Sequence, residues 1–255
     1  MTERVESPWT LFGPLSGGLA GPAPVLRAAH EYCIGNATAG LFAGDSLAAH
    51  IRLLPGASAR LSSPAATYAF TMDRGEAVQH IRIEIEDGAE LDYSPRPLIP
   101  FAGSSLVQAT EFSLTGSASL RAFETLVLGR IDHGEVAAMR RLTSTLSIEI
   151  DGELVLCDAL RIDTGRTSPG TLLRAFCGRP ALGAYCAAGR LALRWRLERE
   201  RLREEAARLR EAGVLIGVSR PHARLVVARA VGPYPEVVES AIVALERKAL
   251  QSADE

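Results

Sequence analysis

The sequence predicts a mainly β protein: a β-helix-like stack of antiparallel hairpins and strands, followed by a small α/β part at the C-terminal end. Two observations support this fold class. Apolar and polar residues alternate over several runs, as they do in strands with one buried face, and a glycine suited to a tight turn interrupts each run. These glycines, Gly56, Gly88, Gly116 and Gly152, recur at spacings of 32, 28 and 36 residues, which favours stacked units.

The clearest copy of the unit surrounds Gly88. Isoleucines alternate with charged residues over residues 81–86, Asp87 and Gly88 supply a turn, and the alternation resumes over residues 89–93. Because Asp-Gly suits the positive φ angles of a two-residue turn, this pattern predicts a β-hairpin at Gly88. We expect the same at the other three glycines.

Length and composition are consistent with one domain, residues 1–255, in three parts. Residues 1–24 are rich in Gly, Pro and Ser, which predicts an irregular N-terminal arm. Residues 25–186 form the predicted β core. Residues 187–255 are expected to run strand, helix, strand, helix.

The C-terminal elements follow from changes in periodicity. Residues 191–197 alternate and predict a strand, after which helical spacing predicts a helix over residues 197–211 that ends at Gly213. Residues 224–229 predict a second strand. Residues 235–250 predict a terminal amphipathic helix, which gives about two helices in the C-terminal part.

Charge and composition exclude several function classes. The net charge is −2 and the pI about 6.3, so no overall field favours nucleic acid or an anionic membrane. The polar N-terminus lacks the features of a secretory signal, and no apolar run approaches the ~18 residues of a membrane span. We therefore expect a cytoplasmic protein whose four cysteines are small buried thiols.

Motifs of catalysis do not occur in the sequence. It contains no G-x-S-x-G, no H-E-x-x-H and no Walker G-x-x-x-x-G-K-[ST], so we expect no enzymatic activity. Two rival classes are a β-helix enzyme acting on acidic polysaccharide and a β-solenoid interaction or carbohydrate-binding module. The first would need clustered charges and an export signal, and the second exposed aromatic residues, of which the chain has few.

Several segments, in order, resemble one family. Residues 40–47 (GLFAGDSL) are similar to a G-G-x-x-G-G-D-x-L segment of the urease accessory protein UreD family, also called UreH. Residues 62–67 (SSPAAT) are similar to a T-T-P-A-A-T segment of the same family. Residues 124–135 (ETLVLGR, then GE) resemble its E-x-x-x-x-G-R…S-G-E signature. Further matches cover residues 87–93, 98–104, 156–161 and 225–232, so the resemblance extends over about residues 22–250.

The resemblance implies a function as well as a fold. Members of this family are not enzymes and bind no cofactor tightly; they act in nickel delivery to apo-urease, in a complex with UreF and the GTPase UreG. Their fold is a β-helix-like stack with C-terminal helices. Ni²⁺ is expected to pass transiently through the interior of such a complex.

The resemblance also implies candidate site residues. Asp45, Glu124 and Asp158 match acidic motif positions, Glu135 is a fourth candidate, and spaced carboxylates suit a passage because oxygen ligands exchange readily. The alternative is that Asp45 caps a turn and that the others are hydrogen-bonded acids that hold loops. The family-motif loop positions are Gly40, Gly44, Pro64, Ala65, Thr67, Gly129 and Arg130.

Two further expectations concern where binding groups and a partner protein would lie on the fold. The loops at residues 35–45 and 94–105 show little periodicity, and loops held on a rigid β scaffold often carry binding groups. The terminal helix places Val238, Ile242 and Leu245 on one apolar stripe, which could hold UreF.

Overall fold

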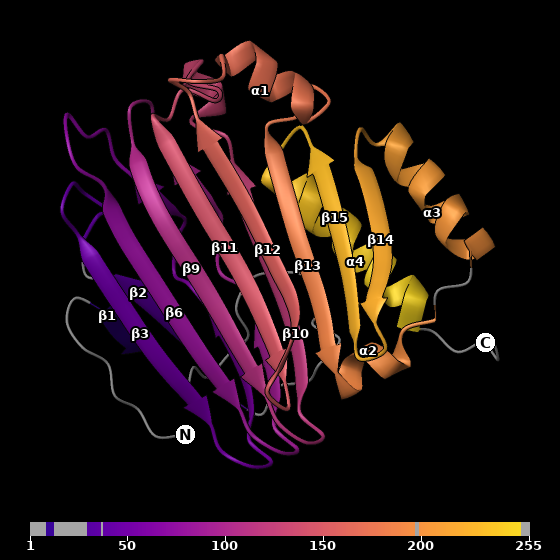
Figure 1. Ribbon diagram of the computed structural model, residues 1–255. Coiled ribbons are helices and arrows are strands. Elements are labelled where there is room, and N and C mark those ends of the chain that lie inside the picture. The colour runs from indigo at the N-terminus through magenta and orange to yellow at the C-terminus, as the bar shows by residue number, and fades with distance from the viewer. Residues whose placement is uncertain (1–8, 13–29, 37, 197–198, 251–255) are drawn as a thin grey trace.

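Two β-sheets face each other in the computed structural model, which describes residues 9–12, 30–36, 38–196 and 199–250. The smaller sheet, called the front sheet here, has the order β12-β11-β9-β6-β3 (Figure 1). The larger back sheet has the order β1-β2-β4-β7-β10-β13-β15-β14; in addition β8 pairs with β10, and β5 pairs with β8. The front strands are β3 (Ser46–Leu53), β6 (Ala77–Ile85), β9 (Ser105–Leu114), β11 (Arg141–Ile150) and β12 (Glu153–Asp163). The back strands are β1 (Trp9–Phe12), β2 (His30–Asn36), β4 (Ser58–Ser62), β5 (Thr67–Ala69), β7 (Glu90–Tyr93), β8 (Leu98–Pro100), β10 (Ser119–Val127), β13 (Ala181–Gly189), β14 (Leu215–His222) and β15 (Leu225–Gly232).

The chain winds as a coil between these sheets. It passes from β3 to β4, from β6 to β7 and from β9 to β10, each time leaving the front sheet for the back sheet. Successive coils stack, so β3, β6, β9 and β11 pair in parallel, as do β2, β4, β7 and β10. The predicted mainly β, β-helix-like stack is confirmed.

The glycines mark the corners of this coil. Gly56, Gly88 and Gly116 have φ angles of 70°, 70° and 59°, in the left-handed region that favours glycine. Neighbouring corners hydrogen-bond to each other: the Gly56 N–H donates to the Asp87 carbonyl at 3.0 Å. The carboxylate of Asp87 in turn accepts from the Ser117 N–H at 2.7 Å.

The prediction of a hairpin at each glycine was wrong at three of the four. Only the turn at Gly152 joins two paired antiparallel strands, β11 and β12. The local turn chemistry is the same at all four positions, but at the first three corners the two flanking strands diverge into different sheets. Their apolar faces then meet across the interior: Ile83 of β6 and Leu91 of β7 are both buried in one core cluster.

Two apolar clusters fill the space between the sheets. The larger contains Ile83, Leu91 and Phe112, and the other contains Leu98, Leu106 and Leu142. Inward positions between them carry polar side chains, described below.

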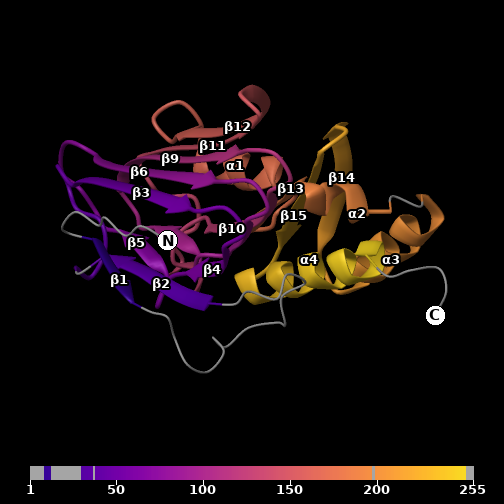
Figure 2. The ribbon, with the colours of Figure 1, turned by 90° about the horizontal axis from the view of Figure 1, so that it is seen from below.

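The C-terminal part extends the back sheet and covers its outer face. The helices are α1 (Pro169–Ala175), α2 (Arg190–Arg194), α3 (Arg199–Glu211) and α4 (Pro235–Leu250), with a short 3-10 turn at Ile131–His133. Figure 2 shows α4 lying along the side of β15 and β14 that faces away from the front sheet. A third apolar cluster, which includes Tyr185, Trp195 and Val226, fills this second interface.

Several predictions for this part need correction. The strand expected over residues 191–197 is instead α2, because Gly189, with a φ of 66°, ends β13 and the helix buries Leu191 and Ala192. The helix expected over 197–211 is α3, although residues 197–198 lie outside the described residues. The strands β13 and β14 and the short helices α1 and α2 were not predicted. Among the described residues from 187 on there are three helices, α2, α3 and α4, where about two were expected.

The terminal helix uses its apolar stripe for its own fold. Val238, Ile242 and Leu245 are 0%, 1% and 1% exposed, and they pack in the cluster beneath α4. The idea that this stripe holds a partner protein was therefore wrong.

A buried ionic network also ties α4 to the back sheet. The Nε of Arg121 on β10 donates to Glu246 Oε2 on α4 at 2.9 Å, and its Nη1 donates to Asp92 Oδ1 on β7, also at 2.9 Å. The Tyr185 hydroxyl donates to Glu246 Oε1 at 2.7 Å. Because a buried charge is costly unless it is paired, these contacts offset the burial of Arg121, Asp92 and Glu246 where α4 meets the sheet.

The N-terminal arm is described only in part. Within the predicted irregular segment, residues 9–12 form β1, which pairs antiparallel with β2; the rest of residues 1–24 lie outside the described residues. In the described ranges, no helix has the length and apolar character needed to cross a membrane.

Candidate functional site

Two adjoining cavities lie in the interior between the sheets. The first has a volume of about 260 Å³ and the second about 460 Å³. They share four lining residues, Leu98, Gln108, Glu124 and Thr125, so Glu124 stands where one cavity meets the other. Most of their lining is apolar, and the polar side chains of Gln108, Glu124 and Thr125 stand among these apolar residues.

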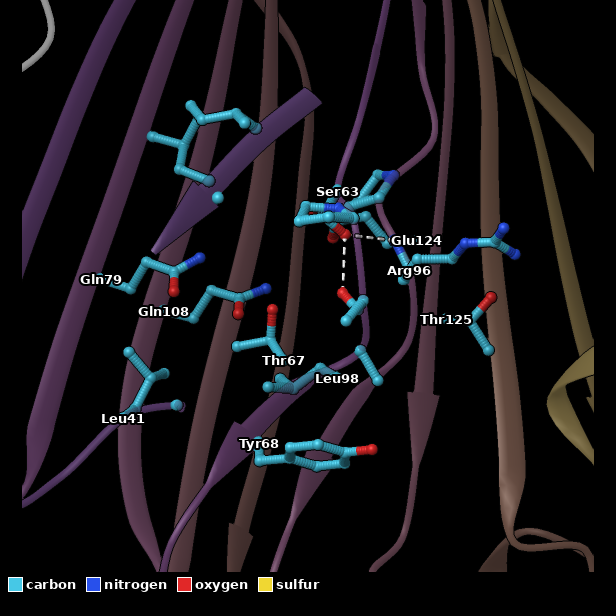
Figure 3. Close-up of a pocket in the computed structure, with 18 of the residues that line it drawn as sticks. Leu41, Ser63, Thr67, Tyr68, Gln79, Arg96, Leu98, Gln108, Glu124 and Thr125 are labelled. Atoms are coloured by element: carbon cyan, nitrogen blue, oxygen red, sulfur yellow. Dashed lines mark hydrogen bonds between the residues drawn. The ribbon is translucent and has the colours of Figure 1, made fainter. Parts of the chain in front are cut away.

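The loops predicted to carry binding groups surround the first cavity. Gly40 and Leu41 from the loop at 35–45, and Arg96 and Leu98 from the loop at 94–105, line it. The Ser63 hydroxyl, which also lines this cavity, accepts a hydrogen bond from the Arg96 N–H at 2.8 Å and so ties the loop at 94–105 to the segment that follows β4 (Figure 3).

Four of the family-motif loop positions line the same cavity: Gly40, Pro64, Ala65 and Thr67. Gly40 has a structural reason to be glycine. A Cβ there would lie 2.4 Å from the carbonyl oxygen of Tyr68, where the Leu41 N–H donates to that same oxygen at 2.7 Å. The close approach of the two backbones therefore shapes the cavity wall.

Polar residues at inward strand positions form the far wall. Gln79 on β6 pairs in register with Gln108 on β9, and Gln108 with Ser144 on β11, so the three lie on one rung of the front sheet. Gln79 and Gln108 are 7% and 9% exposed. Figure 3 shows their amides side by side at the cavity, with Glu124 and Arg96 across from them.

Glu124 is the carboxylate at the junction. It belongs to β10, whose neighbouring inward residues Ala122 and Leu126 are apolar. The Thr110 hydroxyl donates to Glu124 Oε1 at 2.8 Å. Burial away from bulk water raises the pKa of Glu124 to about 7, against the opposing effect of the Thr110 hydrogen bond and with a further contribution from the negative charge of Asp158.

Asp158 lines the second cavity from β12. Its carboxylate forms an ion pair with Arg229 of β15 at 2.7 Å, and Arg229 lines the same cavity. The two cavities thus contain two of the predicted carboxylates, Glu124 and Asp158, which are close enough to influence each other electrostatically.

The structure places Asp45 elsewhere. Its Oδ2 accepts a hydrogen bond from the Phe42 N–H at 2.8 Å, across a turn in which Gly44 has a φ of 85°. Asp45 is not among the residues that line either cavity. This geometry matches the alternative given above, a carboxylate that closes a turn.

Glu135 is also held in a loop. It forms an ion pair with Arg130, whose Nε donates to Glu135 Oε2 at 2.9 Å, and this hydrogen bond lowers the pKa of Glu135. The Arg130 guanidinium lies 4.4 Å from the ring centroid of Phe101. At Gly129, with a φ of 100°, a Cβ would lie 1.9 Å from the Glu135 carbonyl oxygen, so this loop requires glycine.

The thiols contribute no ligand set. Cys33 and Cys186 are buried as expected, whereas Cys157 and Cys177 are exposed, contrary to the prediction of four buried thiols. Burial raises the pKa of Cys186 to about 12, which keeps this thiol protonated near neutral pH. In the described ranges, no three or more His, Cys, Asp or Glu side chains come together in a group that could hold a metal ion.

The sequence interpretation missed Gln79, Gln108, Thr110, Ser144 and Arg229. A signal was present for Gln79, since it occupies the same phase as Ile81 and Ile83 and therefore points inward. A polar residue in a buried phase marks a place where the core is interrupted. No comparable signal distinguished Arg229, because its role depends on a strand that is distant in sequence.

Comparison with known protein sequences identifies one family. Residues 19–253 match the sequence model of the family described as UreD urease accessory protein. A urease accessory protein UreD from Opitutus terrae is 34% identical over 199 residues, which is 73% of this chain and 71% of that protein. UreD from Pseudomonas putida strain GB-1 is 34% identical over 187 residues, or 71% of this chain and 62% of that protein.

A third relative matches over a shorter stretch. Urease accessory protein UreD 2 from Streptomyces griseus is 36% identical over 135 residues, 52% of this chain. The match spans 46% of that protein, about half of its length. Since the family model covers most of the chain and two relatives share a third of its residues over most of its length, the chain belongs to the UreD urease accessory protein family.

Proposed function

We propose that this chain acts in urease maturation as a scaffold for nickel delivery, in a complex with UreF and the GTPase UreG, and that Ni²⁺ moves through the two adjoining cavities toward apo-urease. The single observation that carries the proposal is the position of Glu124, a half-buried carboxylate at the junction of two cavities between the sheets. Membership of an accessory family supports a role other than catalysis.

The ligand chemistry of the cavities suits passage. A site through which an ion moves must bind it strongly enough to admit it and weakly enough to release it. Two carboxylates and the side-chain oxygens of Gln79 and Gln108 offer oxygen ligands, which Ni²⁺ exchanges more readily than thiolate or imidazole. The ion would thus be held by few protein ligands at a time, with water completing its coordination.

In this proposal Glu124 and Asp158 contact the ion. Asp45 and Glu135, which line neither cavity, stay predicted positions on the path, and their contacts with Phe42 and Arg130 favour roles in holding loops. UreF, UreG and urease would bind outer surfaces of the stack.

The test is urease activation in a reconstituted accessory system at limiting Ni²⁺. We expect Glu124→Gln and Asp158→Asn to lower the yield of active urease several-fold while the variants still co-purify with UreF and UreG. Glu153→Gln, an exposed glutamate at the start of β12, is the matched control and should activate normally. Asp45→Ala is tested beside them.

Two results would overturn the proposal. Full activation by the double variant Glu124→Gln/Asp158→Asn would show that no ion depends on these carboxylates. Loss of activation together with loss of the complex would show that the residues support assembly and not passage.

A further inference from the structure

A seam between β12 of the front sheet and β15 of the back sheet borders the second cavity. The front sheet ends at β12, while the back sheet continues from β13 to β15 and β14 (Figure 1). Two arginine–aspartate ion pairs join β12 and its turn to β15 and its preceding loop. Arg224 Nη1 lies 2.6 Å from Asp151 Oδ2, and Arg229 Nη2 lies 2.7 Å from Asp158 Oδ2.

The first pair is anchored to the backbone of a corner. Arg224 Nη2 also donates to the carbonyl of Gly116 at 2.6 Å, and Asp151 Oδ1 accepts from the Gly116 N–H at 2.8 Å. These contacts connect the ends of β9, β11 and β15. This end of the seam is therefore held by several contacts that share one corner.

The second pair lies at the cavity and is less constrained. Among the described residues, Arg229 has its ion pair with Asp158 and no additional hydrogen bond to a backbone carbonyl. The side chain of Arg229 is 47% exposed and that of Asp158 31% exposed. A long arginine side chain with this exposure can swing its guanidinium into solvent without leaving a buried charge behind.

The register of the back sheet places Arg229 level with Glu124. Glu124 pairs with Ala184 on β13, and Ala184 pairs with Arg229 on β15, so only a methyl group stands between the two charged side chains on this face. With strands ~4.8 Å apart, their Cα atoms are separated by about 10 Å. The cavity thus runs from Glu124 over Ala184 to the Arg229–Asp158 pair.

We propose that Arg229 is a latch on this seam: it occupies the Asp158 carboxylate, and a divalent cation gains that ligand only when the guanidinium swings away. This inference rests on the proposed passage of Ni²⁺ and concerns how the ion gains access to it. The positive charge of Arg229 opposes a cation at Asp158 in two ways, by repelling it and by competing for the same oxygens. Arg229 is a positioning residue, since it does not itself bind the ion.

The test measures binding of Ni²⁺ alone to the full chain by equilibrium dialysis. Arg229→Gln should lower the Kd for Ni²⁺ about tenfold, the size expected when one opposing charge near a partly exposed site is removed. Arg229→Lys, which keeps the charge, should bind as the wild type does. Arg224→Gln is the matched control, because it breaks the other arginine–aspartate pair of the seam away from the cavity, and it should leave the Kd unchanged.

The tighter Ni²⁺ binding expected of Arg229→Gln must also depend on Asp158. We expect Arg229→Gln/Asp158→Asn to lose the tighter binding. Arg229→Met, which retains an apolar stem, provides a second neutral variant if Arg229→Gln does not fold as judged by circular dichroism. Wild-type affinity in a folded neutral variant would overturn the latch.

The binding and activation experiments together distinguish failure of the Arg229 proposal from failure of the proposed Ni²⁺ passage. If Glu124→Gln and Asp158→Asn lower activation but the neutral Arg229 variants bind Ni²⁺ as the wild type does, the latch alone is wrong. If neither carboxylate variant changes Ni²⁺ binding or activation, the passage itself is wrong.

Discussion

Replacing Glu124 with glutamine should stabilise the protein, and more so at high pH. Glutamine keeps the shape of the side chain and still accepts the hydrogen bond that the Thr110 hydroxyl donates at 2.8 Å. It removes the negative charge, which burial disfavours. Burial is also what raises the pKa of Glu124 from its ordinary 4.5 to about 7.

Proton binding by Glu124 decides whether the free energy of unfolding rises or falls with pH. Between pH 4.5 and 7 the folded state holds the Glu124 proton while the unfolded state has released it. The free energy of unfolding of the wild type therefore falls as pH rises through this window, and it stays lower above pH 7. The Glu124→Gln variant has no such proton, so its stability lacks this fall.

The rise in the pKa of Glu124 sets how much stability the wild type loses. At about 1.4 kcal/mol per pKa unit, a rise from 4.5 to about 7 corresponds to about 3 kcal/mol at pH 8 and about 1 kcal/mol at pH 5. Glu124 keeps some accessible surface because it faces a cavity large enough for water, and water there screens the charge. We therefore expect the stabilising effect of Glu124→Gln to be about 1–2 kcal/mol larger at pH 8 than at pH 5.

Urea denaturation of both proteins at the two pH values, followed by circular dichroism, measures this difference. Other titrating groups affect wild type and variant alike, so they cancel in the comparison. Glu153→Gln, on the exposed end of β12, is the control and should change stability by less than about 0.5 kcal/mol at either pH. An effect of Glu124→Gln that is equal at pH 5 and pH 8 would refute the raised pKa and the burial argument behind it.

Two further changes test the scaffold. Gly129→Ala should lower the free energy of unfolding by about 2–4 kcal/mol, because its Cβ would lie 1.9 Å from the Glu135 carbonyl oxygen, whereas Gly134→Ala, with open space around its Cβ, should cost about 1 kcal/mol; equal losses in urea denaturation would contradict the steric argument. Glu246→Gln should cost about 3 kcal/mol or more, since it leaves the buried Arg121 charge without one of its two carboxylates; a thermal melt with an unchanged Tm would show that α4 does not depend on this pair.

Much of the architecture followed from local pattern. The alternation in β6 placed Ile81, Ile83 and Ile85 on one buried face, and all three are 3% exposed or less. The left-handed φ angles at Gly56, Gly88 and Gly116 agree with the turns expected there. Such features depend on a residue and its immediate neighbours, which is why the sequence reveals them.

The partners of each strand did not follow from local pattern. Asp87-Gly88 suits a hairpin and a corner equally, and the choice depends on whether the next strand meets its predecessor or a strand about 30 residues away. The same limit applied after Gly189, where alternating apolar residues suggested a strand and packing against Trp195 produced a helix.

For the candidate site, the sequence by itself determined the family resemblance and the acidic positions Glu124 and Asp158, because motif residues and their order are written in the chain. Only the tertiary structure decided that these two lie in adjoining cavities, that Asp45 and Glu135 are held in loops, and that Arg229 pairs with Asp158. The physical reason is that a cavity and an ion pair are formed by side chains from strands far apart in sequence. Their register is settled by the packing of whole sheets, and no short segment contains it.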